Sequence, residues 1–190
     1  GKETRKLKRT FLFLMPKAYS REATAVKALE LFSEMWDKKT RQKPRGVIFT
    51  NTLAESNEVI QSIRDSITAI EVGGHTTDYD PERIDVELQF KRKKIDWLVA
   101  TSTLELWVDY GDVDFVVIFG MPRRLSSFVQ RIGRAGRKRD AVVFVVFNPD
   151  IPLDYYFYES HKLLSDGALR EKAMEKEVLT IGLLNEEATR

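Results

Sequence analysis

Short apolar runs along the chain alternate with longer segments in which apolar residues recur every three or four positions. The longer segments predict amphipathic helices over 23–36, 54–67, 81–90 and 126–132. The apolar runs predict strands over 10–15, 46–51, 68–72, 95–101, 113–120 and 141–147. Because these strands are almost continuously apolar, the pattern predicts a parallel α/β sheet that is covered by helices on both faces.

The length and composition predict one domain of ordinary size with additions at its ends. The chain has 190 residues, of which 43% are hydrophobic, and this is enough to bury a substantial core. We expect a basic arm over 1–9, the α/β domain over 10–152, and a helical extension or the start of a further domain over 153–190.

The charge is low in total but concentrated in a few places. The net charge is +2, and the basic residues cluster in Lys2–Arg9, Lys38–Arg45, Lys91–Lys94 and Arg123–Arg139. Local patches of this kind attract a polyanion even when the whole molecule is nearly neutral. The chain has no cysteine and two histidines, which argues against a zinc site. No apolar run approaches the length of a membrane span, so we expect a cytoplasmic protein without a membrane partner.

Small polar residues follow three of the predicted strands. They are Thr50, Asn51 and Thr52, then Gly73, Gly74 and His75, and finally Thr101, Ser102 and Thr103. Ligands of parallel α/β sheets bind at the carboxyl ends of the strands, where hydroxyls and backbone amides can donate to phosphate oxygens. The same residues also suit helix N-caps, and the two interpretations are compatible.

The octapeptide QRIGRAGR, at 130–137, combines three arginines with two glycines. If the preceding helix continues through it, Gln130, Arg134 and Arg137 fall on one stripe, with Arg131 offset from that stripe. Each glycine would cost a helix about 1 kcal/mol relative to alanine, which favours a site that something approaches closely over a plain basic surface helix. Arginine suits phosphate because its planar fork binds two oxygens and keeps its charge.

Three segments together resemble a known family. FVQRIGRAGR resembles motif VI of superfamily 2 helicases, LVATSTLELWVDYGDVDFVVIFGMP resembles their motif V, and GVIFTNT resembles their motif IV. The resemblance covers about residues 45–147 and is nearest to the Lhr-like and YprA-like DNA helicases. It implies the RecA-like carboxy-terminal domain of a two-domain motor, in which ATP lies between the domains and single-stranded nucleic acid crosses both.

The resemblance also implies roles for individual residues. Arg134 and Arg137 match the arginine fingers that reach the γ-phosphate of ATP. Around the nucleotide, Gln130 matches the residue that senses the phosphate end, and Asp109 and Gly111 match motif V positions. The nucleic-acid backbone positions are Thr50, Asn51, Thr101, Thr103 and, with less support from its neighbours, His75.

Two departures from the family pattern limit these expectations. Trp107 occupies the position before the Val-Asp pair of motif V, where the family usually has glycine. The chain also lacks a GxxxxGK[ST] loop and an acidic DExx strand end, so we do not expect it to hydrolyse ATP alone. ATP and Mg²⁺ would be held mainly by an amino-terminal RecA-like domain, in cis or in trans, and single-stranded DNA is favoured over RNA. The alternative is a non-catalytic RecA-like module that binds nucleic acid or protein.

Overall fold

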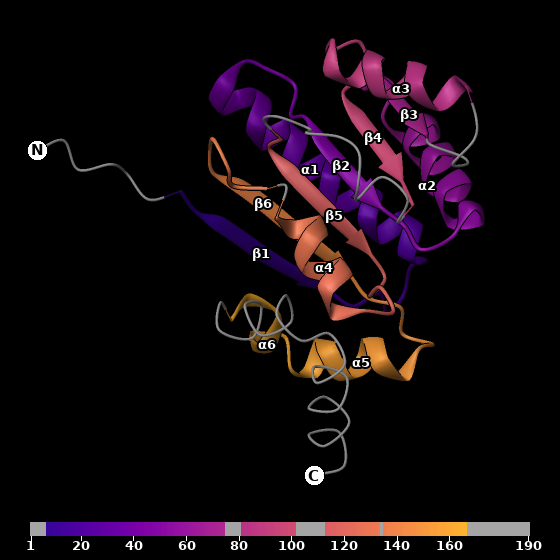
Figure 1. The fold of residues 1–190 in the computed structure, drawn as a ribbon, viewed down its shortest axis with the longest axis vertical. Coiled ribbons are helices and arrows are strands. Elements are labelled where there is room, and N and C mark those ends of the chain that lie inside the picture. Colours follow the sequence, from indigo (N-terminus) through magenta and orange to yellow (C-terminus); the bar gives the residue numbers. More distant parts are fainter. Residues whose placement is uncertain (1–6, 75–80, 102–112, 134, 167–190) are drawn as a thin grey trace, which may run out of the picture.

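The computed structural model describes residues 7–74, 81–101, 113–133 and 135–166, and they form a single six-stranded sheet with helices around it (Figure 1). The strands are β1 (Arg9–Leu14), β2 (Gly46–Phe49), β3 (Val72–Gly74), β4 (Trp97–Ala100), β5 (Phe115–Phe119) and β6 (Ala141–Val146). The helices are α1 (Arg21–Thr40), α2 (Leu53–Ser66), α3 (Pro81–Lys91), α4 (Leu125–Ile132), α5 (Pro152–Glu159) and α6 (Lys162–Ser165). All neighbouring strands pair in parallel, in the order β1-β6-β5-β2-β4-β3.

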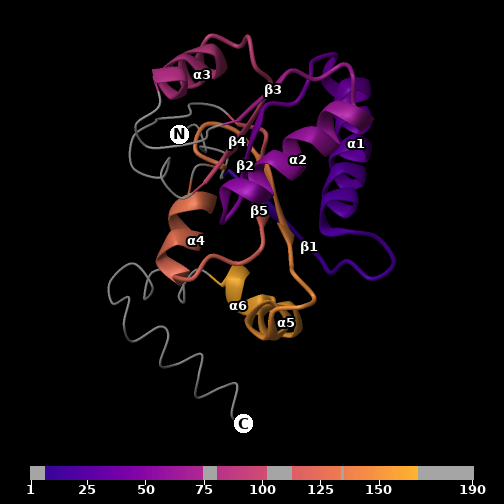
Figure 2. The ribbon, with the colours of Figure 1, turned by 90° about the vertical axis from the view of Figure 1, so that its right-hand side faces the viewer.

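Helices cover both faces of this sheet, as the apolar pattern predicted (Figure 2). Successive residues of a strand point to opposite faces, so Val47 and Phe49 enter one core and Ile48 enters the other. Helices α1 and α2 pack on the side of Ile48, whereas α3, α4, α5 and α6 contribute side chains to the core around Phe49. The central strands are therefore buried on both faces, which explains their continuous apolar sequences.

The strand predicted over 68–72 is wrong in all but its last residue, because β3 spans Val72–Gly74. Ile70 is buried and Ile67, the C-cap of α2, packs on the same core, so the alternation in TAIEV reflects a turn that is fixed by apolar side chains. Gly73 and Gly74 lie within the strand, where a Cβ would collide with Ile95 and Ile60 respectively. They serve close packing and are not polar residues beyond a strand end.

Helix α4 ends at Ile132, as the predicted range 126–132 has it, so it does not continue through Arg137 and the stripe of Gln130, Arg134 and Arg137 does not form on one helix. Gly133 is the C-cap, and Gly136 has φ +74°, a left-handed conformation that L side chains rarely adopt. A Cβ at Gly136 would lie 2.8 Å from Cγ of Arg9. Gly136 therefore turns the chain between α4 and β6, and the group that approaches it closely is the side chain of Arg9.

Two short helices follow the last strand. Phe157 of α5 and Leu164 of α6 are buried in the same core as Phe128 of α4, so these helices pack against the sheet domain. Residues 167–190 of the expected helical extension lie outside the described residues, as do residues 1–6 of the expected basic arm. Across the described residues, no helix is both long enough and apolar enough to span a bilayer.

Candidate functional site

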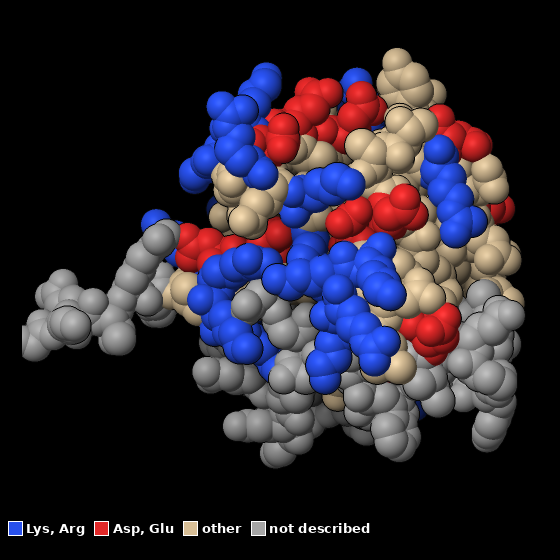
Figure 3. Space-filling view, turned by 90° about the horizontal axis from the view of Figure 1, so that it is seen from above, with Lys and Arg blue, Asp and Glu red and all other residues tan. Residues whose placement is uncertain are grey.

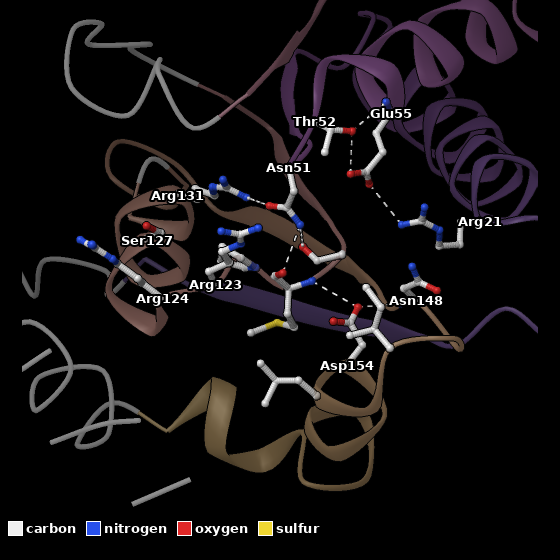
Figure 4. A pocket seen from close by; sticks show the side chains of 15 residues that line it. Arg21, Asn51, Thr52, Glu55, Arg123, Arg124, Ser127, Arg131, Asn148 and Asp154 are labelled. Carbon is white, nitrogen blue, oxygen red and sulfur yellow. Dashed lines mark hydrogen bonds and ion pairs between the residues drawn. The ribbon is translucent and has the colours of Figure 1, made fainter. Parts of the chain in front are cut away.

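Asn51 connects three segments at the carboxyl end of the sheet (Figure 4). It follows β2, and its Nδ2 donates to the carbonyl oxygens of Gly120 and Met121, at 3.3 and 3.1 Å. Its Oδ1 accepts a hydrogen bond of 3.1 Å from Nη1 of Arg131. The turn after β2, the turn after β5 and helix α4 are therefore held together by one exposed amide side chain.

Arg131 is one of the largest fully buried side chains of the described part, with 1% of its surface exposed. Its guanidinium lies over the ring of Phe49, 5.5 Å from the ring centroid, and donates to Asn51. The motif pattern predicted Arg131 to be offset from the stripe of Gln130, Arg134 and Arg137 and gave no sign of this contact. The helical spacing could have revealed it, since Arg131 falls on the buried face of α4 with Leu125, Phe128 and Ile132.

The two threonines beside Asn51 have structural contacts. Thr50 is fully buried, and its Oγ1 lies 2.5 Å from Oγ of Ser56 and donates to the carbonyl of Thr52 at 3.2 Å. Thr52 is the N-cap of α2 and accepts from the backbone N–H of Glu55 at 3.2 Å. The capping interpretation therefore describes Thr52. Asn51 and Thr52 are both exposed, whereas Thr50 is buried. Thr101, directly after β4, is half-buried.

An open cavity of about 710 Å³ lies at this carboxyl edge, and we call it the carboxyl-edge cavity. Figure 4 shows Arg123, Arg124 and Arg131 on one side of it and Asn148 and Asp154 on another. The remaining lining residues are Arg21, Asn51, Thr52, Glu55, Gly120, Met121, Pro122, Ser127, Ile151 and Leu153. Arg21 pairs with Glu55 at 3.2 Å and lies over the ring of Phe119, 4.8 Å from its centroid.

Asp154 is a buried acid in this cavity, with 2% of its surface exposed. Its Oδ2 accepts from the backbone N–H groups of Asn148 and Met121, at 2.7 and 3.3 Å. Burial raises the pKa of Asp154 above its ordinary value, while these two hydrogen bonds and the charge of Arg21 act in the opposite direction. Asp154 was not among the residues predicted from the sequence. An acid in the first turn of a helix that begins with proline was the available signal.

The described residues of the QRIGRAGR segment are arranged around the end of α4. Gln130 is exposed on the helix, and Arg137 is exposed in the turn before β6, at the amino edge of the sheet. Nε of Arg137 donates to the carbonyl of Gly133 at 2.8 Å. Within the described part of the chain, Nη1 and Nη2 of Arg137 have no hydrogen-bond partner. The other candidates, His75, Thr103, Asp109, Gly111 and Arg134, lie outside the described residues, as does Trp107.

Exposed basic residues also gather at the amino ends of the strands. Lys43 precedes β2, Lys91–Lys94 precede β4, and Lys138 precedes β6. Viewed from above, Lys and Arg side chains form a band across the middle of the molecular surface, with acidic side chains at its borders (Figure 3). Some of this charge is paired locally, as between Lys43 and Asp96 at 3.9 Å. No cluster of acids and histidines that could hold a metal ion is found among the described residues.

The family model described as the helicase conserved C-terminal domain matches residues 25–139. This chain belongs to that family. The match contains the turn after β2 and the whole of α4, so both Asn51 and Arg131 lie inside the matched region. The resemblance to superfamily 2 helicases is thereby confirmed.

Relatives and solved structures agree with this assignment. The ATP-dependent helicase hrq1 of Schizosaccharomyces pombe is 26% identical over 145 residues, which are 72% of this chain and 14% of the relative. The ATP-dependent helicase Lhr-Core of Methanocaldococcus jannaschii is 33% identical over 93 residues, which are 48% of this chain and 11% of the relative. The chain thus spans a small part of the length of these relatives.

Two solved structures extend the comparison to the fold. The DUF1998 helicase MrfA bound to DNA and AMPPNP matches with a TM-score of 0.63 and 25% identity, over 82% of this chain and 22% of that protein. The C-terminal domain of the DEAD-box protein Dbp5 matches with a TM-score of 0.55 and 17% identity, over 83% of this chain and 86% of that domain. The likeness to Dbp5 shows the fold alone. The RecA-like α/β fold that the sequence predicted is confirmed.

Proposed function

We propose that this domain is the second motor half of a nucleic-acid-dependent ATPase and supplies Arg137 to ATP held by another RecA-like domain. The observation that carries the proposal is the position of Arg137. Its Nε donates to the carbonyl of Gly133, while its terminal nitrogens have no hydrogen-bond partner among the described residues and the side chain is exposed. An arginine anchored in this way is oriented in advance for a ligand outside its own domain.

The chemistry of Arg137 would be electrostatic. Charge develops on the oxygens of the γ-phosphate during phosphoryl transfer, and a positioned guanidinium stabilises it without needing a proton transfer. The names of the relatives hrq1 and Lhr-Core describe ATP-dependent helicases, which supports ATP as the nucleotide. Mg²⁺ and most contacts to ATP would come from the other domain. Arg134, Gln130, Asp109 and Gly111 are proposed at the nucleotide on the strength of the motif resemblance.

Single-stranded nucleic acid would lie along the carboxyl edge. Asn51 is exposed there, and Arg123 and Arg124 bring positive charge to the same edge. Contacts of this kind bind phosphate and carry little sequence information. Thr101, Thr103 and His75 are proposed to extend this surface, and buried Thr50 would support it from within. DNA is favoured because the solved structure of MrfA, a structural neighbour, holds DNA.

The test is ATP hydrolysis by the longest natural protein that contains this chain, with and without single-stranded DNA. The proposal predicts turnover that rises when the strand is added. If the protein carries its own Walker-type loop and still shows no turnover, the motor assignment fails. Strand binding without hydrolysis would then favour the non-catalytic module. Trp107→Gly, which restores the residue usual in the family, would be the first substitution to make.

A further inference from the structure

The geometry points to a base-selective subsite: the carboxyl-edge cavity receives one nucleotide of the bound strand. The exocyclic amino group of its nucleobase donates a hydrogen bond to the carboxylate of Asp154. This inference rests on the proposed function, because it places a single strand at this edge. It adds that one base is turned into the domain and is recognised there. The relevant chemistry is that of cytosine, adenine or guanine, as opposed to thymine or uracil.

The cavity has two chemically different sides. Arg123, Arg124 and Arg131 lie on one side, whereas Asp154 and Asn148 lie on another (Figure 4). Arg123 and Arg124 are exposed, whereas Arg131 is buried and donates to Asn51, and Arg21, the further arginine of the lining, is paired with Glu55. A surface that bound only phosphates would gain nothing from a buried carboxylate, which repels them. The arrangement suits a ligand with an anionic end and an end that donates hydrogen bonds, and a nucleotide has both.

The rim of the cavity provides apolar contact for a base ring. Ile151 and Leu153, at the start of α5, are 45% and 41% exposed and line the cavity beside Asp154. Met121 and Pro122 add apolar surface. The cavity volume of about 710 Å³ falls within the range of about 300–1,000 Å³ that is typical of small-molecule sites. The site can therefore hold a nucleotide, with the flat faces of its base against aliphatic side chains.

Asp154 supplies the selectivity. Its Oδ2 is occupied by the N–H groups of Asn148 and Met121, which fixes the carboxyl group in place. No hydrogen bond to Oδ1 is found within the described part of the chain, and Asp154 belongs to the lining of the cavity. An ionised carboxylate only accepts, so Oδ1 matches the amino group of cytosine or adenine. At the corresponding position thymine and uracil present a carbonyl oxygen, which the carboxylate disfavours.

The experiment compares two labelled strands of equal length, oligo(dC) and oligo(dT), by fluorescence anisotropy with this chain. At low salt and mildly alkaline pH, where oligo(dC) stays single-stranded, we expect oligo(dC) to bind about tenfold more tightly. Asp154→Asn keeps an oxygen for the two backbone N–H groups but removes the second acceptor, so the preference should disappear. Asp150→Asn makes the same change of charge in the exposed loop outside the cavity and should keep the preference.

The outcomes distinguish a failure of the base-selective subsite from a failure of the proposed function. Equal binding of the two strands by the unaltered chain overturns the base-selective subsite and leaves the proposed motor function intact. A preference that survives Asp154→Asn overturns the role of Asp154. Absence of binding to either strand contradicts the nucleic-acid surface itself. The comparison with the unaltered chain needs no variant, so it remains decisive even if Asp154→Asn does not fold.

Discussion

At the scale of single residues, the carboxyl edge is organised by Asn51 and Arg131. A buried guanidinium is tolerated only when its charge is compensated, and here the amide oxygen of Asn51 and the ring of Phe49 contribute to that compensation. Asn51 in turn holds the turn after β5 through the carbonyls of Gly120 and Met121. The pair therefore links motif IV to motif VI inside one domain.

A double-mutant cycle tests this link. Arg131→Ala should lower the free energy of unfolding by about 3 kcal/mol, because it removes a large buried side chain together with its contacts. Asn51→Ala should lower it by ~1–3 kcal/mol, since the carbonyls of Gly120 and Met121 lose a donor and Arg131 loses one of its acceptors. The interaction energy from urea denaturation should reach about 1 kcal/mol. Strictly additive effects would show that the two side chains act independently.

The titration of Asp154 gives a second prediction at this scale. Burial raises its pKa in the folded state, so protonated Asp154 favours folding and its contribution is lost as pH rises through the raised pKa. Asp154→Asn should therefore stabilise the domain relative to the parent at neutral pH, and less so at acid pH. Thermal unfolding of both proteins over a pH series measures the difference. A gap that does not change with pH would contradict the buried-acid interpretation.

At the scale of elements, α4 and the turn after it determine where the arginines of motif VI lie. The helix runs from the turn after β5 to Ile132, and the left-handed Gly136 then redirects the chain towards β6. Because helical side chains lean towards the helix N-terminus, Arg131 reaches back to Asn51. Arg137 lies beyond the helix and stays exposed at the amino edge. Arg131 and Arg137, six residues apart, thus lie at opposite edges of the sheet.

Gly136→Ala tests the turn. A side chain there meets both a left-handed backbone, with φ +74°, and the side chain of Arg9. We expect a loss of about 1–2 kcal/mol of stability and a further loss of ATP turnover in the complete motor, because Arg137 is displaced. Gly133→Ala is the comparison: its φ of −62° adds no left-handed strain, although a Cβ there would lie 3.1 Å from the carbonyl oxygen of Val129, so we expect a smaller loss of stability. Equal effects of the two substitutions, measured by urea denaturation and by turnover, would contradict this account of the turn.

The sequence predicted the elements that pack on the core and failed where local packing overrides periodicity. The central strands were predicted because burial on both faces leaves continuous apolar runs. TAIEV looked like a strand because Ile70 and Val72 are buried, yet only Val72 belongs to β3. Asn51 was selected from the motif, but its bond to Arg131 depends on tertiary contact between residues 80 positions apart. Asp154 and the carboxyl-edge cavity arise from segments that no single motif contains.

At the scale of the whole molecule, positive charge is distributed over two edges although the net charge is only +2. The carboxyl edge carries Arg123 and Arg124, and the amino edge carries Lys91–Lys94 before β4 and Arg137 before β6. This distribution suits a domain that meets a nucleic-acid strand along one edge and a nucleotide-bearing partner near the other.

The salt dependence of strand binding tests the charged surface. Each phosphate that the domain neutralises releases counterions, so the logarithm of the binding constant should fall linearly with the logarithm of the salt concentration, with a slope of about −0.7 per phosphate for a single strand. Arg123→Ala should make this slope shallower and weaken all sequences alike. Anisotropy titrations over a salt series give the slope. A binding constant that is insensitive to salt would rule out a phosphate-binding edge.

The central claim is that Arg137 acts on ATP held by another domain, and the most direct test measures nucleotide affinity and turnover together. In the complete motor, Arg137→Ala should reduce DNA-stimulated turnover by about 10³-fold or more, while affinity for a fluorescent ATP analogue changes far less. Lys138→Ala, the neighbouring exposed cation, should leave turnover near that of the parent. Turnover in Arg137→Ala equal to that of the parent would contradict the assignment.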